Sequence, residues 1–361
     1  MLILFLKILL FKLSKKIGFP NIKPINYTIS ITYRCNSKCK TCNITQRKAD
    51  DLSVEEYKKI FSSIGKSPYW VTISGGEPFL RNDLVEICQV IYKYSKPKII
   101  NIPTNGILVK NVVEFTEKIS KTCPKSNIVI NLSIDNVGDK HDYIRGVKGN
   151  YTRVMECFKR LNELNLPNLT IGIHTVISRF NIDDFTNIMN TFLSFHPDSY
   201  ITEIAEQRVE LNTEHSNIVP NLIDYSNAMD LLIHRIKHSH FKGLSRITEA
   251  FRIEYYQLVK RILREKTQII PCYAGYVSVQ IAPDGDVWPC CIKAKSVGNL
   301  RDFHYNFKKL WRNNPVLKEE RNRINNKKCY CPMANASYTN MLMNFKTLFR
   351  VAYRSFVKWY V

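Results

Sequence analysis

The 361-residue sequence has no apolar run long enough to cross a bilayer, which takes about 20 residues. Its most apolar stretch, residues 1–13, is interrupted by Lys7 and Lys12. This stretch has neither a basic start nor a small-residue cleavage site, so we expect no transmembrane helix and no signal peptide. Acidic residues are also scarce, at 31 against 53 Lys and Arg, and the net charge of +22 favours an anionic partner.

The positive charge is concentrated toward the two ends of the chain. Residues 1–49 contain ten Lys or Arg and no acid. Residues 336–361 predict an amphipathic helix, because basic residues recur every four positions and aromatic residues take the opposite face. The basic positions are Lys346, Arg350, Arg354 and Lys358, and the apolar ones are Phe345, Phe349, Ala352, Phe356, Trp359 and Tyr360. Such a helix either lies in a membrane interface or packs its aromatic face on the protein.

The eleven cysteines are odd in number and gather in two groups, which favours metal or redox chemistry over a disulfide framework. The first group has CxxxCxxC spacing and consists of Cys35, Cys39 and Cys42. Structural zinc sites commonly pair their cysteines two by two, whereas three thiolates can bind three irons of a four-iron cluster and leave the fourth iron open. The second group consists of Cys272, Cys290, Cys291, Cys329 and Cys331. We expect the solitary Cys88, Cys123 and Cys157 to be buried small hydrophobes.

Between residues 25 and 205, short apolar runs alternate with helical patterns six times. The apolar runs, which predict strands, are 27–33, 70–74, 99–102, 128–134, 169–177 and 199–204. Ser53 and Glu56 form a capping-box pattern that predicts that the first helix begins at Ser53. Six strand–helix units predict a parallel sheet with right-handed crossovers, and therefore an α/β fold built as an open, partial (β/α)6 barrel.

Unusual polar residues follow four successive strands. Cys35 follows the first, and Gly75, Gly76, Glu77 and Pro78 follow the second. Thr104 and Asn105 follow the third, and Ser133 and Asp135 close the fourth. In parallel α/β barrels the active site is built from the loops at the carboxyl ends of the strands, so we expect these residues to share one site.

The cysteine trio, the Gly-Gly-Glu-Pro motif and the six-unit pattern together make residues 26–210 resemble the radical S-adenosylmethionine (SAM) enzymes. The resemblance implies a four-iron cluster on the trio whose open iron binds the amino and carboxylate groups of SAM, and a 5′-deoxyadenosyl radical that abstracts hydrogen from a substrate. The implied cofactor-binding residues are Gly75, Gly76, Glu77, Pro78, Asn105, Ser133, Asp135 and Arg145. Glycines would let the backbone approach the ligand, Ser133 and Asp135 would contact the ribose, and Arg145 would pair with the methionine carboxylate.

The second cysteine group resembles the auxiliary-cluster domains called SPASM or, when shortened, Twitch. Cys272 and Cys290 flank a segment, 277–288, that predicts a β-hairpin with a Pro-Asp-Gly turn. The resemblance implies a second four-iron cluster on Cys272, Cys290, Cys329 and Cys331, with Cys291 as the spare or as a replacement for one of the last two. A zinc site is the alternative for this set.

These patterns predict a small C-terminal auxiliary-cluster domain, a β-hairpin plus helix, after the barrel. The predicted boundaries are 1–24 for an amphipathic segment, 25–225 for the barrel, 226–268 for a helical linker, 269–335 for the auxiliary domain and 336–361 for the basic helix. Candidate proton acceptors on or near late strands are His174, Glu203 and Glu206, each of which can also be structural. The general base and other substrate-contacting catalytic residues are not predicted.

The sequence-based functional hypothesis is a radical SAM oxidoreductase or transferase acting on a sugar, glycan or lipid-linked substrate near a membrane. The alternatives are a peptide- or protein-modifying maturase and a non-catalytic iron–sulfur protein that binds membrane or nucleic acid. We expect an acidic electron donor, a flavodoxin or ferredoxin, because the surface is basic. No RNA-binding module is visible, which argues against a nucleic-acid partner. The expected location is cytoplasmic, with peripheral attachment to the inner face of the membrane.

Overall fold

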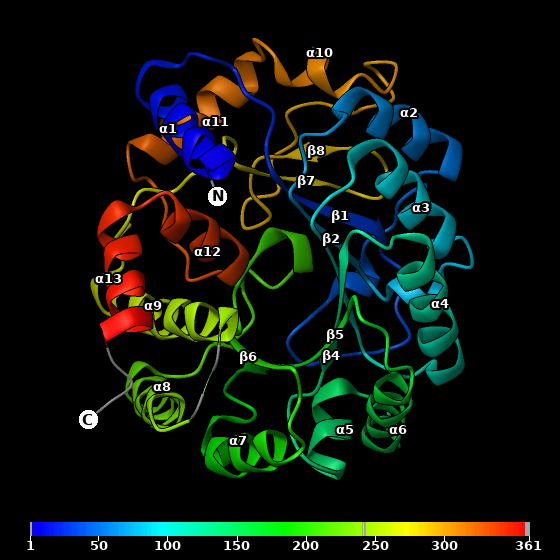
Figure 1. Cartoon of the computed structure of the whole chain (residues 1–361), viewed down its shortest axis with the longest axis vertical. Helices are drawn as coiled ribbons and strands as arrows, with labels where there is room; N and C mark the ends of the chain where they lie inside the picture. Colours follow the sequence, from blue (N-terminus) through cyan, green and yellow to red (C-terminus); the bar gives the residue numbers. More distant parts are fainter. Residues whose placement is uncertain (1, 240, 242, 358–361) are drawn as a thin grey trace.

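The computed structural model describes residues 2–239, 241 and 243–357. Its centre is a curved eight-stranded sheet with the order β6-β5-β4-β3-β2-β1-β7-β8 (Figure 1). The strands are β1 (Asn26–Thr32), β2 (Trp70–Gly75), β3 (Ile99–Thr104), β4 (Asn127–Ser133), β5 (Leu169–Ile177), β6 (Ser199–Ile204), β7 (Ser278–Ile281) and β8 (Val287–Trp288). Strands β1 to β6 pair in parallel in chain order, which confirms the predicted partial barrel.

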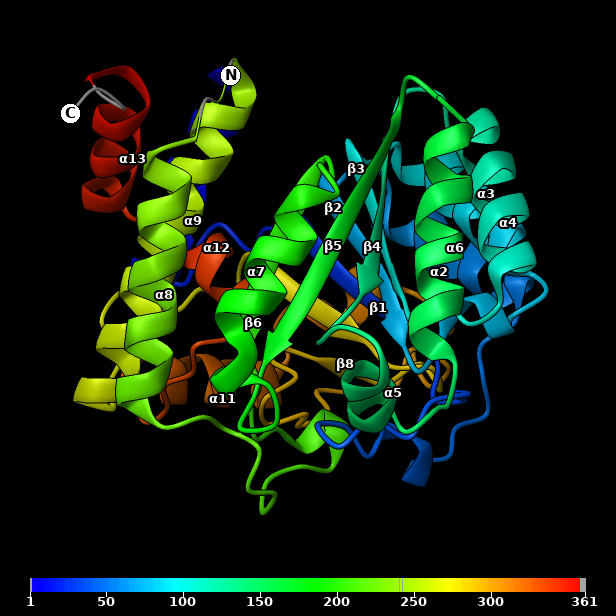
Figure 2. The same ribbon diagram turned by 90° about the horizontal axis from the view of Figure 1, so that it is seen from below.

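Helices cover the outer face of the sheet (Figures 1 and 2). Those between the barrel strands are α2 (Val54–Ile64), α3 (Leu84–Ser95), α4 (Val109–Thr122), α5 (Asp139–Arg145), α6 (Asn150–Glu163) and α7 (Phe185–Ser194). The predicted capping box is present, with the Ser53 side chain accepting from the Glu56 amide. After the barrel come α8 (Leu222–Lys237), α9 (Leu244–Glu265), α10 (Phe307–Trp311), α11 (Pro315–Asn325) and α12 (Ala334–Leu342).

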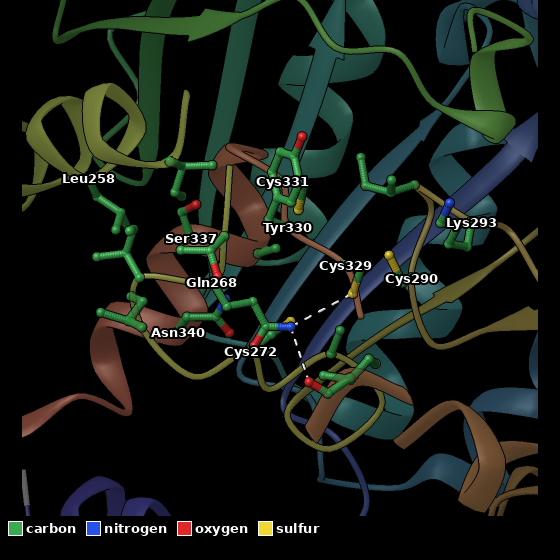
Figure 3. Close-up of a pocket in the computed structure, with 18 of the residues that line it drawn as sticks. Leu258, Gln268, Cys272, Cys290, Lys293, Cys329, Tyr330, Cys331, Ser337 and Asn340 are labelled. Carbon is green, nitrogen blue, oxygen red and sulfur yellow. Dashed lines mark hydrogen bonds between the residues drawn. The ribbon is translucent and has the colours of Figure 1, made fainter. Parts of the chain in front are cut away.

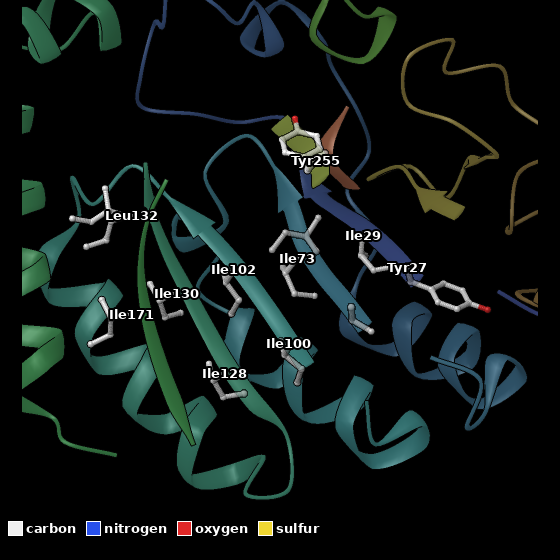
Figure 4. Packing of buried hydrophobic residues seen from close by; sticks show 14 of the residues in the cluster. Tyr27, Ile29, Ile73, Ile100, Ile102, Ile128, Ile130, Leu132, Ile171 and Tyr255 are labelled. Carbon is white, nitrogen blue, oxygen red and sulfur yellow. The ribbon is translucent and has the colours of Figure 1, made fainter. Parts of the chain in front are cut away.

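The two faces of the barrel strands differ in polarity because strand side chains alternate between them. Apolar side chains such as Ile100, Ile128 and Ile130 are fully buried in the main core (Figure 4). The alternate positions carry polar side chains, and Asn131 donates to Asn101 Oδ1 at 2.7 Å from the neighbouring strand. The main core also contains cysteine side chains. Cys88, Cys123 and Cys157 are all fully buried, as expected.

The predicted hairpin is present, but it does not stand apart from the barrel. Strand β7 pairs in parallel with β1, so the hairpin extends the barrel sheet past its first strand. The turn between β7 and β8 contains Gly285 at φ 93°, a left-handed conformation that glycine adopts at low cost. The segment that carries Cys290 therefore leaves the same sheet that carries Cys35.

The chain's two terminal helices lie at one edge of the molecule, α1 (Leu2–Ile17) and α13 (Phe345–Val357) (Figures 1 and 2). Within the described residues, neither these nor any other helix is long and apolar enough to cross a membrane. Of the positions predicted for the amphipathic C-terminal helix, Lys358, Trp359 and Tyr360 lie outside the described residues.

Candidate functional site

The loop that carries Cys35, Cys39 and Cys42 leaves β1 and is held by backbone contacts to the end of α5. Lys38 N–H donates to the Arg145 carbonyl at 3.1 Å, and Lys40 N–H donates to the Ile144 carbonyl at 2.9 Å. Gly146 follows at φ 67°, and a Cβ there would lie 2.4 Å from the Lys38 carbonyl oxygen. Only glycine therefore lets α5 approach this loop so closely.

The three thiols lie near one another in a largely buried setting. Burial raises the pKa of Cys35 to about 11, and Cys39 contributes to the rise. Burial and the thiols of Cys39 and Cys35 raise the pKa of Cys42 to about 12. Arg145 Nη1 lies 3.8 Å from Cys39 Sγ, so a cation faces the trio. Buried thiols with a guanidinium beside them fit an anionic iron–sulfur cluster, which would supply an electron to bound SAM.

The two glycines after β2 are required by neighbouring backbone. A Cβ on Gly75 would lie 2.2 Å from the Thr32 carbonyl oxygen, and one on Gly76 would lie 2.1 Å from the Arg34 carbonyl oxygen. Gly76 N–H donates to Thr32 and Glu77 N–H donates to Arg34, at 2.7 and 2.9 Å. In this structure the glycines bring β2 against the end of β1, just before Cys35; their predicted role toward a ligand stays a prediction.

Glu77 is buried, and hydrogen bonds occupy both oxygens of its carboxylate. Oε1 accepts from the Thr104 hydroxyl at 2.8 Å and from the Phe79 amide at 3.2 Å, and Oε2 accepts from the Asn105 amide at 2.8 Å. Burial raises the pKa of Glu77 to about 7, although these hydrogen bonds lower it. Pro78 begins the short 3-10 helix Pro78–Leu80. Glu77 thus ties the loop after β2 to the loop after β3.

Asn105 extends this connection to the cysteine loop. Its Nδ2 donates to Asn36 Oδ1 at 2.7 Å and to Ser37 Oγ at 3.0 Å, and its Oδ1 accepts from the Ile107 amide. Its carbonyl accepts from Asn150 Nδ2 at 3.0 Å. The Asn105 side chain is therefore engaged with the protein, and the predicted contact to SAM stays a prediction.

Sequence reasoning missed His141 and Asn150, which continue the network. The Asp135 amide donates to His141 Nδ1 at 3.1 Å, so the proton is on Nε2, which donates to Asn150 Oδ1 at 3.1 Å. Burial and then Arg145 lower the pKa of His141 to about 4, which keeps the ring neutral. No local motif marks either residue, because their partners come from other loops.

Asp135 and Arg145 form a buried ion pair with Nε and Oδ2 2.8 Å apart. The side chains are 1% and 11% exposed, respectively. Asp135 Oδ1 accepts from the Val176 amide at 2.9 Å, so both carboxylate oxygens have protein partners. Burial alone would lower the pKa of Arg145, but Asp135 and Cys39 raise it. Ser133 ends β4 opposite His174 of β5. The predicted ribose contacts of Ser133 and Asp135 stay predictions.

The second cysteine group surrounds a cavity between α9, α11 and α12 (Figure 3). The thiol-bearing residues that line it are Cys272, Cys290, Cys329 and Cys331. Burial, then Cys272 and Cys329, raise the pKa of Cys290 to about 12. These three thiols are therefore close enough to interact electrostatically. Gln268 Nε2 lies 3.7 Å from Cys329 Sγ. Four thiols around one cavity fit a four-iron cluster.

Cys291 faces away from this cavity. It does not line the cavity, and its Sγ lies 3.0 Å from the Met333 sulfur and 4.0 Å from Arg208 Nη1. Within the described ranges, no three Cys, His, Asp or Glu side chains are close enough together to share one metal ion.

A segment after β6, residues 206–212, lies between the two cysteine sets. It carries the candidate proton acceptor Glu206 and two charges that the sequence did not single out, Arg208 and Glu210. The Arg208 and Glu210 side chains are 3.8 Å apart, from Nη1 to Oε2. Burial raises the pKa of Glu206 to about 8, and its Oε1 has no hydrogen-bond partner among the described residues. The His174 and Glu203 side chains approach to 3.4 Å on the neighbouring strands.

Sequence comparison identifies two known families in this chain. The model of the radical SAM superfamily matches residues 29–192, and that of the SPASM iron–sulfur cluster-binding domain matches residues 272–332. The chain is 25% identical over 301 residues to the antilisterial bacteriocin subtilosin biosynthesis protein AlbA of Bacillus subtilis (strain 168), covering 81% of this chain and 60% of AlbA. It is 21% identical over 285 residues to the sporulation killing factor maturation protein SkfB of the same strain, covering 77% and 62%.

The chain thus spans about three fifths of the length of these two relatives. Among solved structures, SuiB of Streptococcus suis bound to SAM superposes with a TM-score of 0.63 at 17% identity, over 86% of this chain and 70% of SuiB. This likeness confirms the fold. The radical SAM domain binds SAM and a [4Fe–4S] cluster, and the SPASM domain indicates an auxiliary cluster. The chain belongs to the radical SAM superfamily and carries a C-terminal SPASM-type iron–sulfur domain.

Proposed function

We propose that this chain is a peptide-modifying radical SAM enzyme. The observation that carries the proposal is the likeness to AlbA, a bacteriocin biosynthesis protein, along 81% of this chain. SkfB is a maturation protein, and SuiB has been solved with its precursor peptide SuiA. These relatives favour the maturase alternative over the sugar, glycan or lipid-linked substrate of the main sequence-based hypothesis.

Each cysteine group has its own role in the proposal. Cys35, Cys39 and Cys42 bind the cluster that holds SAM, with Arg145 as the cation facing it. Cys272, Cys290, Cys329 and Cys331 hold the auxiliary cluster. Glu77 and Asn105 act indirectly, since their side chains position the trio's loop.

The substrate would lie in the barrel, between the two cysteine groups. The polar positions there include Asn131 Oδ1, which has no hydrogen-bond partner among the described residues. Buried polar atoms without partners are costly, so a polar ligand such as a peptide backbone would stabilise this site. In the proposal, His174 and Glu203, whose side chains approach to 3.4 Å, would accept a proton from a substrate that has lost hydrogen.

The proposal is tested by tracing deuterium from cell extracts into 5′-deoxyadenosine. The reconstituted enzyme is incubated with SAM, dithionite and the low-mass fraction of cells grown on deuterated nutrients, because hydrogen abstraction transfers one deuterium to the product. We expect deuterated 5′-deoxyadenosine from this fraction and its loss after protease digestion of the fraction.

Two controls make the outcome decisive. A Cys39→Ala variant should form no 5′-deoxyadenosine, since the trio then lacks a ligand. A chloroform–methanol lipid extract or a protease-treated glycan fraction is tested in parallel. Deuterium transfer from either of these, but not from the peptide fraction, would overturn the proposal in favour of a lipid-linked or sugar substrate.

A further inference from the structure

Helix α13 is attached to the protein by its charged residues, and its aromatic residues face outward. Arg350 Nε and Arg354 Nε lie 2.6 and 2.9 Å from the two carboxylate oxygens of Glu254 on α9. The Glu254 side chain is 3% exposed. By contrast, Phe349 and Phe356 are 73% and 81% exposed. Packing of the aromatic face on the protein, one of the two sequence-based alternatives, is thus wrong for these residues.

This orientation is unusual, because the aromatic side chains of an amphipathic helix normally enter the core and its charges face water. Ion-pair contacts from Arg350 and Arg354 to the buried Glu254 explain it, since an unpaired buried carboxylate would be costly. The small residues Thr347, Val351 and Ser355 complete the inner face of the helix. The aromatic face is therefore available to something outside the chain.

Helix α1 also exposes apolar residues. Its inner face packs Ile8 and Phe11 into a small cluster with Tyr273, Tyr276 and Met343. Its outer face exposes a stripe at helical spacing that consists of Leu6, Leu9, Leu10, Leu13 and Ile17, each 42–60% exposed. A helix that is apolar on both faces has a second apolar contact or is exposed to an apolar medium.

The two helices form one continuous surface. Lys12 on α1 donates to the Met343 carbonyl at 3.3 Å, and its ammonium lies 3.6 Å from the centroid of the Phe345 ring at the start of α13. Both views show the helices at the same edge of the molecule (Figures 1 and 2). More than half of the large apolar side chains that are exposed in the described residues lie on these helices or on Phe19 just after α1.

We propose that α1 and α13 together bind the surface of an anionic phospholipid bilayer. Neither helix contains an acidic residue, and Lys16, Lys346 and half-exposed Arg350 border the apolar stripes. Leucine and phenylalanine on one side with lysine and arginine beside them is the composition of interfacial helices. The apolar side chains would enter the acyl boundary while the cations meet the headgroups.

A bilayer accounts for this surface better than a protein partner does. Leu9 and Leu13 line a groove between α1 and residues 268–273, but the other exposed apolar side chains of the two helices do not line it. A flat and adaptable apolar medium can cover these outward-facing side chains. The basic border matches anionic headgroups by charge. A second copy of this chain would instead bring two equally basic surfaces together.

The test is flotation of the anaerobic holoenzyme with vesicles. We expect it to float with vesicles of phosphatidylcholine and phosphatidylglycerol, to remain at the bottom with phosphatidylcholine alone, and to be released by high salt. The double variants Phe349→Ser/Phe356→Ser and Leu6→Ser/Leu10→Ser should each lower the bound fraction by about tenfold or more.

The matched control is Ile223→Ser, which removes a side chain that is 72% exposed on α8 and should leave binding unchanged. Iron content and circular dichroism verify that each variant folds. The proposal is overturned if both double variants still float with the anionic vesicles. It is also overturned if the wild-type enzyme does not float and is instead a dimer that the same variants convert to monomers. Since flotation needs no turnover, this result is independent of the proposed catalytic function.

Discussion

Asn43, the residue directly after Cys42, donates its backbone N–H to the carbonyl of Leu211 at 3.0 Å. Two residues earlier in that segment, Val209 N–H donates to the Ile292 carbonyl at 3.1 Å, and Glu210 N–H donates to the Cys291 carbonyl at 3.4 Å. One short 3-10 helix, Val209–Leu211, is therefore bonded to both cysteine-bearing loops. This connection fixes the separation of the two cluster sites, which matters if electrons pass between them.

Arg208, just before this helix, should raise the reduction potential of the cluster on the trio. Its guanidinium lowers the pKa of the Cys42 thiol, which shows that its charge reaches that site, although burial dominates and raises this pKa. An Arg208→Gln variant should therefore lower the potential in a redox titration followed by electron paramagnetic resonance. Arg34→Gln is the control. Arg34 directly precedes Cys35 in the sequence, but its side chain is 67% exposed, so solvent screens its charge. Equal potentials in wild type and Arg208→Gln would contradict the prediction.

Gly146→Ala should impair the trio's loop far more than Gly149→Ala. Both glycines have a left-handed φ, so alanine costs about 1–2 kcal/mol at either position. Only at position 146 would the Cβ also meet backbone, whereas nothing lies within 4 Å at position 149. We expect Gly146→Ala to bind about four irons instead of about eight, by iron analysis and absorbance. Similar iron content in both variants would count against the close contact with Lys38.

Cys291→Ala should keep both clusters, whereas Cys329→Ala should lose the auxiliary one. The reason is that Cys329 lines the cavity and Cys291 contacts Met333 outside it. Reconstituted Cys291→Ala should thus contain about eight irons per chain and Cys329→Ala about four. The reverse result would show that Cys291 is a ligand and Cys329 the spare.

Arg145→Gln should destabilise the chain by about 3–5 kcal/mol, because it leaves Asp135 buried without its cation. Asp135→Asn in the same chain should restore much of the free energy of unfolding, since no unpaired charge remains. SAM binding, measured by isothermal titration on the reconstituted enzyme, should stay weak in the double variant. Recovery of SAM binding would mean that the pair is structural only.

Glu77 should make the cluster-free chain less stable as the pH rises. Its folded pKa of about 7 exceeds the ordinary 4.5, so the folded state favours the protonated carboxyl. The stabilisation is complete below about pH 4.5 and is lost as the pH passes through about 7, a change of about 3 kcal/mol. Denaturant titrations across this pH window give the free energy of unfolding as a function of pH. Glu77→Gln should flatten this dependence, and the exposed Glu55→Gln should not. Parallel slopes for wild type and Glu77→Gln would exclude this assignment.

The sequence by itself determined the barrel, the cysteine trio and the hairpin, because each is encoded locally. Each of these features depends on residues that are near one another in the chain. They are the strand and helix periodicity, the spacing of Cys35, Cys39 and Cys42, and the Pro-Asp-Gly turn. The terminal helices were also visible as amphipathic patterns.

Only the tertiary structure decided which partners these local elements meet. The pairing of β7 with β1, the exclusion of Cys291 from the cavity and the contact of Asn43 with Leu211 join residues far apart in the chain. Phe349 faces outward because the arginines of α13 pair with Glu254, about a hundred residues earlier in the chain. A periodic pattern shows that a helix has two faces, but which face turns inward depends on the charge buried in the helix that it meets.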